Sequence, residues 1–202
     1  LRVPPPNARR LGTADVLRQA RVINAVADLG IPVPQVIWKG EEEEWFGSPY
    51  FIVEFLQGDT LGGEWGDRLT AGQIKPMAIQ AVKVLAKLHR LDWISVVSND
   101  GPPISLEDDV RRWDRFLEKT SDPDDLDIAP LVKKRLLECL PITPRVGIFH
   151  GDFQWSNLFF NNECKFTALI DWELWGVGAP LNDLGWFLTF LDRDAWKHPQ
   201  IT

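Results

Sequence analysis

The chain has 202 residues, of which 45% are hydrophobic and 25% are charged, and its formal net charge is −7. These proportions are those of a globular protein and argue against disorder of the whole chain. No block of Lys and Arg could neutralise a row of phosphates, so we expect no nucleic-acid partner. The sequence shows neither a signal peptide nor an apolar run long enough to span a membrane, and its two cysteines form no CxxC motif. We therefore expect a cytoplasmic protein without a membrane partner.

The N-terminal part of the chain predicts one helix and two strands. Thr13 is a suitable N-cap for an amphipathic helix over residues 14–29, and Gly30 is a suitable helix stop. Residues 36–38 and 50–56 are apolar runs bounded by turn residues, which is typical of short strands. The acidic run between the strands is expected to be a solvated turn. This order of elements predicts a small α+β unit.

The next part of the chain is predicted to be helical. Thr70 and Gln73 resemble a capping box at the start of an apolar face that continues to His89. Pro76 interrupts that helix at a cost of about 3 kcal/mol, so we expect either a kink or a helix that begins at Pro76. Two more helices are predicted, over residues 106–119 and 131–140, and an acidic loop is predicted over residues 121–127.

A polar motif follows the short apolar strand predicted over residues 146–149. Residues 149–157 read Phe-His-Gly-Asp-Phe-Gln-Trp-Ser-Asn, and a second predicted strand, over residues 165–170, leads to Asp171. Asn161 and its neighbours are turn residues, which predicts a hairpin. The hairpin would bring Asn157 and Asp171 close together in space.

The residue types and their spacing in this motif suit phosphoryl transfer. That reaction needs a group that orients and deprotonates the acceptor hydroxyl, and oxygen ligands for Mg²⁺. Asp152 and Asn157 are five residues apart, and Asp171 ends a later strand, as in protein kinases. We therefore expect Asp152 to receive the proton and Asn157 and Asp171 to bind Mg²⁺, with His150 in a supporting role. Taken singly, each of His150, Asp152 and Asn157 would more often be a turn or cap residue, so their joint spacing carries the prediction.

Several motifs together resemble the aminoglycoside phosphotransferase (APH) family of kinase-like enzymes. The similarity is strongest to the branch related to the kinase-like domain at the front of some long acyl-CoA dehydrogenases. It covers nearly the whole chain and is specific to the superfamily but not to a substrate. The segments that carry it are 31–34, 85–89, 150–160, 168–173 and 178–184.

This resemblance implies an α+β, two-lobed protein-kinase-like fold with ATP bound between the lobes. Residues 1–57 would be a partial N-terminal lobe that ends in the hinge, and residues 58–202 would be a mostly helical catalytic lobe with a catalytic hairpin. Glu54, Phe55 and Leu56 would form the hinge, with their backbone facing adenine. The alternative is that these three residues are simply a buried strand end.

Two further assignments remain open between a functional and a structural role. Asp183 resembles a family Asp that braces the catalytic loop, but it could instead be the N-cap of a helix over residues 184–191. Trp155, Trp172 and Trp175 flank the motif and could line an acceptor pocket, although packing in the core is the commoner use of tryptophan.

The N-terminal residues depart from the family pattern. A complete member has two strands and a phosphate-covering loop before the strand that carries a basic residue, and no such strands precede Leu1, so we expect both ends to be truncated. Arg2 stands in the place of the basic residue. Gln19 stands in the place of the helix Glu that pairs with it, and Gln supplies no charge. We therefore expect this chain to bind ATP and Mg²⁺ weakly.

The leading hypothesis is an ATP- and Mg²⁺-dependent phosphotransferase that moves the γ-phosphate to a hydroxyl of a small molecule. The alternative of a different class is a non-catalytic kinase-like module that binds a nucleotide or another ligand, as Gln19 suggests. A third hypothesis is a metal-dependent hydrolase that uses the same carboxylates. It would require additional His or Asp ligands, and the chain has only three histidines.

Overall fold

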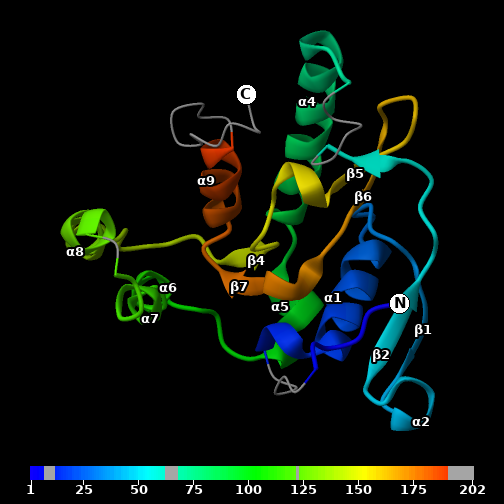
Figure 1. Ribbon diagram of the computed structural model, residues 1–202, viewed down its shortest axis with the longest axis horizontal. Helices are drawn as coiled ribbons and strands as arrows, with labels where there is room; N and C mark the ends of the chain where they lie inside the picture. Colours follow the sequence, from blue (N-terminus) through cyan, green and yellow to red (C-terminus); the bar gives the residue numbers. More distant parts are fainter. Residues whose placement is uncertain (7–11, 62–67, 122, 191–202) are drawn as a thin grey trace.

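The computed structural model describes residues 1–6, 12–61, 68–121 and 123–190 of the chain. These residues form helices and three small sheets, of two, three and two strands (Figure 1). The prediction of a mixed α+β structure is therefore confirmed. No helix in the described ranges is long and apolar enough to cross a membrane.

The first unit consists of one helix on a two-stranded sheet. Helix α1 (Val16–Asp28) contacts both β1 (Val36–Gly40) and β2 (Tyr50–Val53), which pair antiparallel. The acidic run between the strands includes a one-turn helix, α2 (Glu43–Phe46), where we predicted only a turn. The helix and both strands occur where the apolar patterns predicted them.

The start of α1 differs from the prediction. Its N-cap is Asp15, whose Oδ1 accepts a hydrogen bond from the backbone N–H of Arg18 at 2.9 Å. The prediction of Thr13 as N-cap is wrong, because a 3₁₀ turn, η1 (Gly12–Ala14), includes that residue and delays the start of the α-helix. Gly30 ends the helix as predicted, in a left-handed conformation with φ 73°.

Helix α4 (Ala71–Leu88) has the predicted capping box. The backbone N–H of Thr70 donates to Oε1 of Gln73 at 3.0 Å, and the helix begins at Ala71. The alternative start at Pro76 is wrong, because the capping box stabilises a first turn that lies before the proline. Two elements that were not predicted follow it, α5 (Trp93–Val97) and η2 (Ser98–Asp100).

The two helices predicted next have different bounds in the structure. The predicted helix over residues 106–119 is divided into α6 (Leu106–Arg111) and α7 (Asp114–Leu117). The predicted helix over residues 131–140 is the second half of α8 (Pro123–Glu138), so the loop predicted before it is largely wrong. A proline is favourable at the first position of a helix, where its missing N–H costs nothing, and α8 starts at one.

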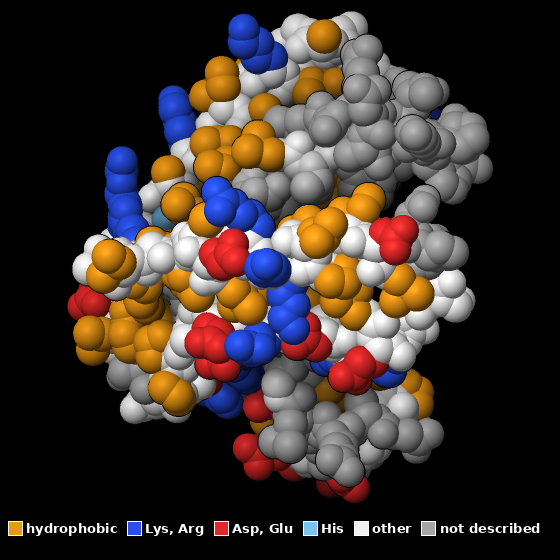
Figure 2. Space-filling view, turned by 90° about the vertical axis from the view of Figure 1, so that its left-hand side faces the viewer, with side chains coloured by type: hydrophobic (Ala, Val, Ile, Leu, Met, Phe, Trp, Pro, Cys, Tyr) orange, Lys and Arg blue, Asp and Glu red, His pale blue; other side chains and the backbone are white. Residues whose placement is uncertain are grey.

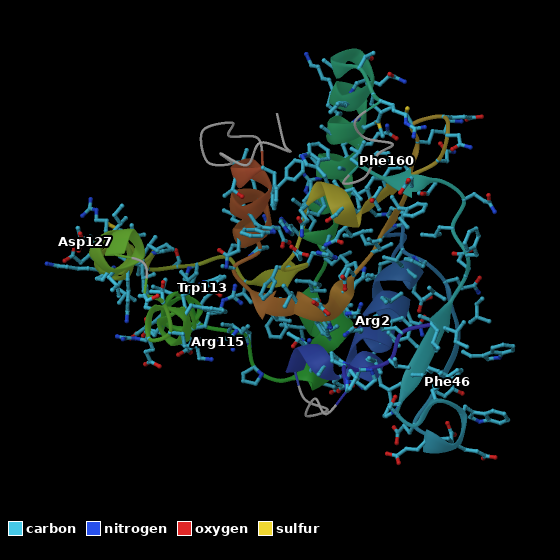
Figure 3. All side chains as sticks on the ribbon, in the orientation of Figure 1. Arg2, Phe46, Trp113, Arg115, Asp127 and Phe160 are labelled. Atoms are coloured by element: carbon cyan, nitrogen blue, oxygen red, sulfur yellow. The ribbon has the colours of Figure 1, made fainter. Side chains whose placement is uncertain are left out.

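Helices α6, α7 and α8 project from the rest of the molecule (Figure 1). Trp113, Arg115 and Asp127 lie on this projection, away from Arg2 and Phe160 (Figure 3). Apolar side chains are exposed among charged ones on the side of the molecule that carries the projection (Figure 2). An open groove of about 810 Å³ lies between α7 and α8, but no residue of the predicted site lines it.

The remaining strands form two antiparallel sheets. One has the order β3 (Asp59–Thr60), β5 (Leu158–Phe160) and β6 (Phe166–Leu169), and the other pairs β4 (Gly147–Phe149) with β7 (Gly176–Gly178). Because β5 and β6 pair directly, the predicted hairpin is confirmed. Three further elements complete the chain as described: η3 (Trp155–Asn157), η4 (Trp172–Leu174) and α9 (Leu181–Thr189).

The main core joins α1 and α4 to the segments around the hairpin. Trp172 and Trp175 are 1% and 3% exposed, which confirms core packing for these two tryptophans. Trp155 is partly buried, and its ring lies edge-on to Phe187 with centroids 4.7 Å apart. The segments that follow the hairpin are therefore fixed by the apolar core.

Candidate active site

The polar motif lies in a loop between β4 and η3. At Gly151 the backbone has φ 87°, and a Cβ there would overlap the backbone carbonyl of Leu174. Only glycine allows both this conformation and this close approach. The loop is thereby held against η4, which begins directly after Asp171.

A buried carboxylate fixes the backbone of this loop. Asp183, which is 1% exposed, accepts hydrogen bonds from the backbone N–H of His150 at 2.8 Å and of Gly151 at 2.7 Å. Nε2 of His89 lies 2.9 Å from Oδ2 of the same carboxylate. Helix α9 already begins at Leu181, so the N-cap alternative for Asp183 is wrong. Asp183 instead anchors the loop from the first turn of α9.

The fully buried ring of His150 connects the loop to the end of β6. Its Nε2 lies 2.9 Å from the backbone carbonyl of Ile170, and its Nδ1 accepts a hydrogen bond from the backbone N–H of Asp152 at 3.3 Å. Burial lowers the pKa of His150 below its usual value, because desolvation disfavours the charged ring. These contacts assign a neutral ring with its proton on Nε2. The side chain supports the loop from within the core.

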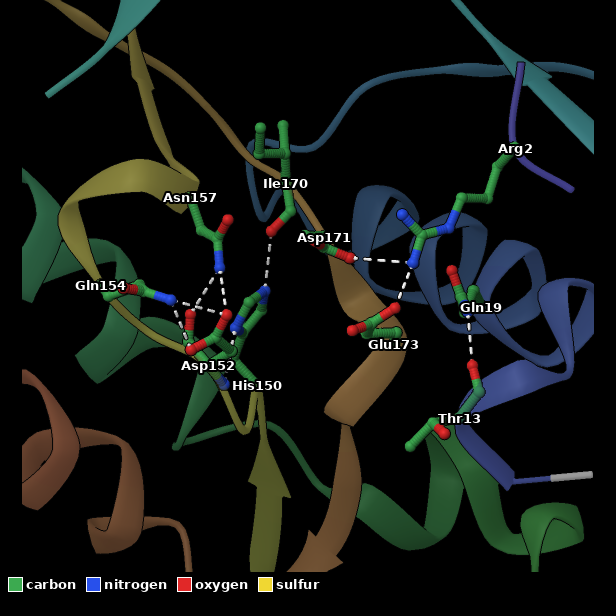
Figure 4. Close-up of polar contacts among 10 residues, drawn as sticks. All are labelled: Arg2, Thr13, Gln19, His150, Asp152, Gln154, Asn157, Ile170, Asp171 and Glu173. Atoms are coloured by element: carbon green, nitrogen blue, oxygen red, sulfur yellow. Dashed lines mark hydrogen bonds and ion pairs between the residues drawn. The ribbon is translucent and has the colours of Figure 1, made fainter. Parts of the chain in front are cut away.

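The carboxylate of Asp152 is surrounded by hydrogen-bond donors (Figure 4). Nε2 of Gln154 donates to Oδ1 at 2.7 Å and to Oδ2 at 2.8 Å. Nδ2 of Asn157 donates to Oδ2 at 2.7 Å and to the backbone carbonyl of Asp152 at 2.8 Å. Nε1 of Trp186, on α9, donates to Oδ1 at 2.9 Å. The contacts of Gln154 and Trp186 were not predicted from the sequence.

The hairpin brings Asn157 and Asp171 to neighbouring positions. The backbone carbonyl of Asn157 accepts from the N–H of Ile170 at 3.0 Å, next to the Leu158–Leu169 pair. Because its amide nitrogen faces Asp152, the amide oxygen of Asn157 points away from that carboxylate (Figure 4). The proximity expected of a hairpin is therefore present.

Asp171 has the features of a cation ligand. Its backbone is left-handed, with φ 61°, and its Oδ1 is buried without a hydrogen-bond partner. Arg2 lies 3.4 Å from this oxygen, which is within ion-pair range but does not make a hydrogen bond. No group of three or more His, Cys, Asp or Glu side chains in the described ranges could hold a metal. A hard cation bound by Asp171 would need further oxygen ligands, which the amide oxygen of Asn157 and phosphate oxygens could supply, and such a ligand set suits Mg²⁺.

Arg2 has a different partner from the one expected. Its backbone forms an isolated antiparallel bridge with Phe51 of β2, and its guanidinium makes an ion pair with Glu173 (Figure 4). Gln19, buried at 2% exposure, donates instead to the backbone carbonyl of Thr13 at 2.9 Å. The amide nitrogen of Gln19 is therefore engaged by Thr13, while the guanidinium of Arg2 pairs with Glu173. Glu173 supplies the carboxylate that pairs with Arg2. Its position two residues after Asp171 was the available sequence signal that it lies near the site.

The three residues predicted as a hinge follow β2. The strand ends at Val53, earlier than predicted, because the N–H of Gln35 donates at 2.8 Å to the side-chain Oε1 of Glu54 instead of to a backbone carbonyl. Phe55 is 86% exposed and Leu56 is partly buried, so the alternative of a buried strand end is wrong. The chain then passes to β3, which pairs with β5 of the hairpin.

The model of the phosphotransferase enzyme family, APH, matches residues 1–201. The chain belongs to this family. Among curated relatives, human acyl-CoA dehydrogenase family member 11 is 27% identical over 195 residues, which are 94% of the chain and 25% of that protein. Mouse acyl-CoA dehydrogenase family member 10 is 27% identical over 194 residues, 90% of the chain and 17% of that protein. This family member thus spans about a quarter or less of the length of these relatives.

Solved structures of aminoglycoside phosphotransferases share this fold. An aminoglycoside-3'-phosphotransferase of type VIII superimposes with a TM-score of 0.62 at 24% identity, covering 92% of the chain and 68% of that protein. The GDP and kanamycin complex of APH(2")-IIIa has a TM-score of 0.63 at 19% identity, and the match covers 82% of the chain and 59% of that protein. A Ralstonia eutropha JMP134 protein has a TM-score of 0.74 at 24% identity, and the match covers 87% of the chain and 55% of that protein. The kinase-like fold expected from the sequence is therefore confirmed.

Proposed function

We propose that the protein is an ATP- and Mg²⁺-dependent phosphotransferase that transfers the γ-phosphate to a hydroxyl group of a small molecule. The observation that carries the proposal is the contact between Asp152 and Asn157 next to Asp171. One loop and one hairpin thereby supply a carboxylate base and two oxygen ligands. Phosphoryl transfer requires little more covalent chemistry from the protein.

In this proposal Asp152 accepts the proton of the acceptor hydroxyl as the hydroxyl oxygen bonds to the γ-phosphorus. The bond from that phosphorus to the β,γ-bridging oxygen breaks, and its electron pair leaves with ADP. Asn157 and Asp171 would hold Mg²⁺, which neutralises charge on the phosphates when bound. Oδ1 of Asp171, which is buried without a hydrogen bond and has only Arg2 in ion-pair range, supports this role. His150 and Asp183 hold the loop that carries the base, and neither needs to touch the substrate.

The nucleotide would bind between residues 1–57 and residues 58–202, with Glu54, Phe55 and Leu56 as the hinge. The exposure of Phe55 after the end of β2 supports a hinge there. Arg2, which reaches across to Glu173, would contact the phosphates. GDP in the APH(2")-IIIa complex supports nucleotide binding in a protein of this fold.

The second candidate is a non-catalytic module that binds a nucleotide without transferring phosphate. The contact of Gln19 with Thr13 favours it, because the charged partner that the family pattern places on α1 is absent there. The carboxylate of Asp152 and the neighbouring ligands favour the enzyme, since a pure binding module needs no base. The hydrolase alternative gains no support from the described residues.

The test is ATP consumption by the intact protein with panels of aminoglycosides, macrolides, choline-like amines, sugars and hydroxyacyl-CoA compounds. Substitution Asp152→Asn should lower turnover with an active acceptor by about 10² to 10⁴, the usual contribution of a general base. Turnover that survives Asp152→Asn undiminished would refute the assignment of the base. Nucleotide binding without turnover in any panel would favour the non-catalytic module.

A further inference from the structure

The carboxylate of Asp152 has no free position for another donor. It accepts four hydrogen bonds from three side chains, two of them from Gln154 and one each from Asn157 and Trp186. An ionised carboxylate offers about four lone-pair positions. Each oxygen therefore already accepts two donors.

A general base must accept a hydrogen bond from the group that it deprotonates. The acceptor hydroxyl in the proposed reaction would be a fifth donor to Asp152, and a fifth donor has no position. One of the three side chains must therefore leave the carboxylate before the hydroxyl can be activated. The three differ in how firmly the rest of the protein holds them.

Asn157 and Trp186 are held by additional contacts. Asn157 is 6% exposed, and its amide also donates to the backbone carbonyl of Asp152 at 2.8 Å. Trp186 is 39% exposed, but it is part of α9 and its ring lies edge-on to Phe190 with centroids 5.2 Å apart. Moving either side chain would break contacts beyond those with the carboxylate.

Gln154 is the donor with the fewest other contacts. Within the described ranges, both hydrogen bonds of its side chain go to the carboxylate of Asp152, from the single atom Nε2. One nitrogen that spans two oxygens makes two less well directed bonds. The side chain is unbranched and its Nε2 has no other hydrogen bond in the described ranges, so rotation about its own bonds releases it.

We propose that Gln154 occupies the position of the acceptor hydroxyl in the free protein and is displaced when the acceptor binds. This inference rests on the proposed function and extends it to the control of a side reaction. When only ATP is bound, Gln154 keeps water away from the base. In the suppressed reaction, a water oxygen bonds to the γ-phosphorus while the bond from that phosphorus to the β,γ-bridging oxygen breaks. The electron pair leaves with ADP, and the proton of the water passes to Asp152.

The test is ATP hydrolysis by the intact protein without an acceptor, measured beside ATP affinity by calorimetry. Gln154→Met keeps the length of the side chain but removes the donor, and Gln154→Ala provides a second variant in case the first misfolds. Hydrolysis should rise about tenfold in both, the effect of one hydrogen bond to a charged group, while ATP affinity stays within about twofold.

Trp186→Phe is the matched control, because it also removes one donor from Asp152 but leaves Gln154 across both oxygens. The increase in the rate of ATP hydrolysis in Trp186→Phe should be at least about threefold smaller than in Gln154→Met, because Gln154 still excludes water. Equal rises in the two variants would mean that any lost donor has the same effect, and would overturn the inference. Hydrolysis that stays at the wild-type rate in both Gln154 variants, with ATP still bound, would also overturn it. Failure of the wild type to bind ATP would instead refute the proposed function, and this inference with it.

Discussion

The anchoring of the loop after β4 by Asp183 leads to a quantitative prediction about stability. The substitution Asp183→Asn keeps the shape of the side chain but replaces one acceptor oxygen by an NH₂ group. In the protein, Oδ1 accepts from Gly151, while Oδ2 accepts from the N–H of His150 and lies beside His89. The amide can satisfy only one of these two sides, whichever way it is turned.

The expected loss follows from the contacts that remain. At a site that is 1% exposed, at least one backbone N–H would face another donor and lose its acceptor. An unsatisfied buried donor costs about 1–3 kcal/mol, and loss of the charge weakens the remaining bonds further. We therefore expect Asp183→Asn to lower the free energy of unfolding by about 3 kcal/mol. With a urea m-value of about 3 kcal/mol per molar, the unfolding midpoint would fall by about 1 M.

Urea unfolding followed by tryptophan fluorescence measures this shift. The matched control is Asp28→Asn, at an exposed position near the end of α1, which should change stability by less than about 0.5 kcal/mol. Equal urea midpoints for the two variants would show that the hydrogen bonds to Asp183 do not stabilise the protein as predicted. That result would refute the assignment of Asp183 as the anchor of the loop.

Three further predictions concern the same site. Gly151→Ala should destabilise the protein by about 2–4 kcal/mol in urea unfolding, because the new Cβ meets the carbonyl of Leu174 at a positive φ. Because burial lowers the pKa of His150 below 6.5, the unfolded chain binds its proton first as the pH falls, so stability should decrease below about pH 6.5. His150→Gln should remove that part of the pH dependence, and an unchanged profile would contradict it. Glu173→Gln removes the charged partner of Arg2 and should change ATP affinity in calorimetry by about fivefold or more, whereas equal affinities would show that the ion pair does not affect the phosphates.

The local part of the site could be predicted from the sequence. The turn residues near Asn161 specify the hairpin, and the hairpin alone brings Asn157 and Asp171 together. These features depend on residues close in the chain, so their spacing is sufficient to predict them.

The long-range contacts could not be predicted in this way. His89 and Asp183 are 94 residues apart, and Arg2 and Glu173 are 171 apart, so only the packing of distant elements brings each pair together. The chemistry of each of these side chains would also allow other polar partners, so residue type alone does not identify the partner. The family resemblance indicated the loop-bracing role of Asp183, but its pattern for Arg2 placed the partner on α1.

The helix bounds also include one feature that could be predicted from the sequence and one that could not. The capping box at Thr70 is local and was predicted correctly. Thr13 and Asp15 are both good caps, and propensity does not choose between them. The 3₁₀ turn before Asp15 decides the outcome, and it leaves no distinct sequence pattern.

Magnesium-dependent nucleotide binding is the most direct test of the proposed site. Calorimetry of the intact protein with ATP, with and without Mg²⁺, compares the wild type with Asp171→Ala. Asp28→Ala, an exposed carboxylate, serves as the control. The proposed site predicts that Mg²⁺ strengthens ATP binding in the wild type and the control, and that this dependence is lost in Asp171→Ala. Binding of ATP that responds to Mg²⁺ equally in all three proteins would contradict the assignment of Asp171, and with it the central claim that this hairpin is the metal side of a phosphotransferase site.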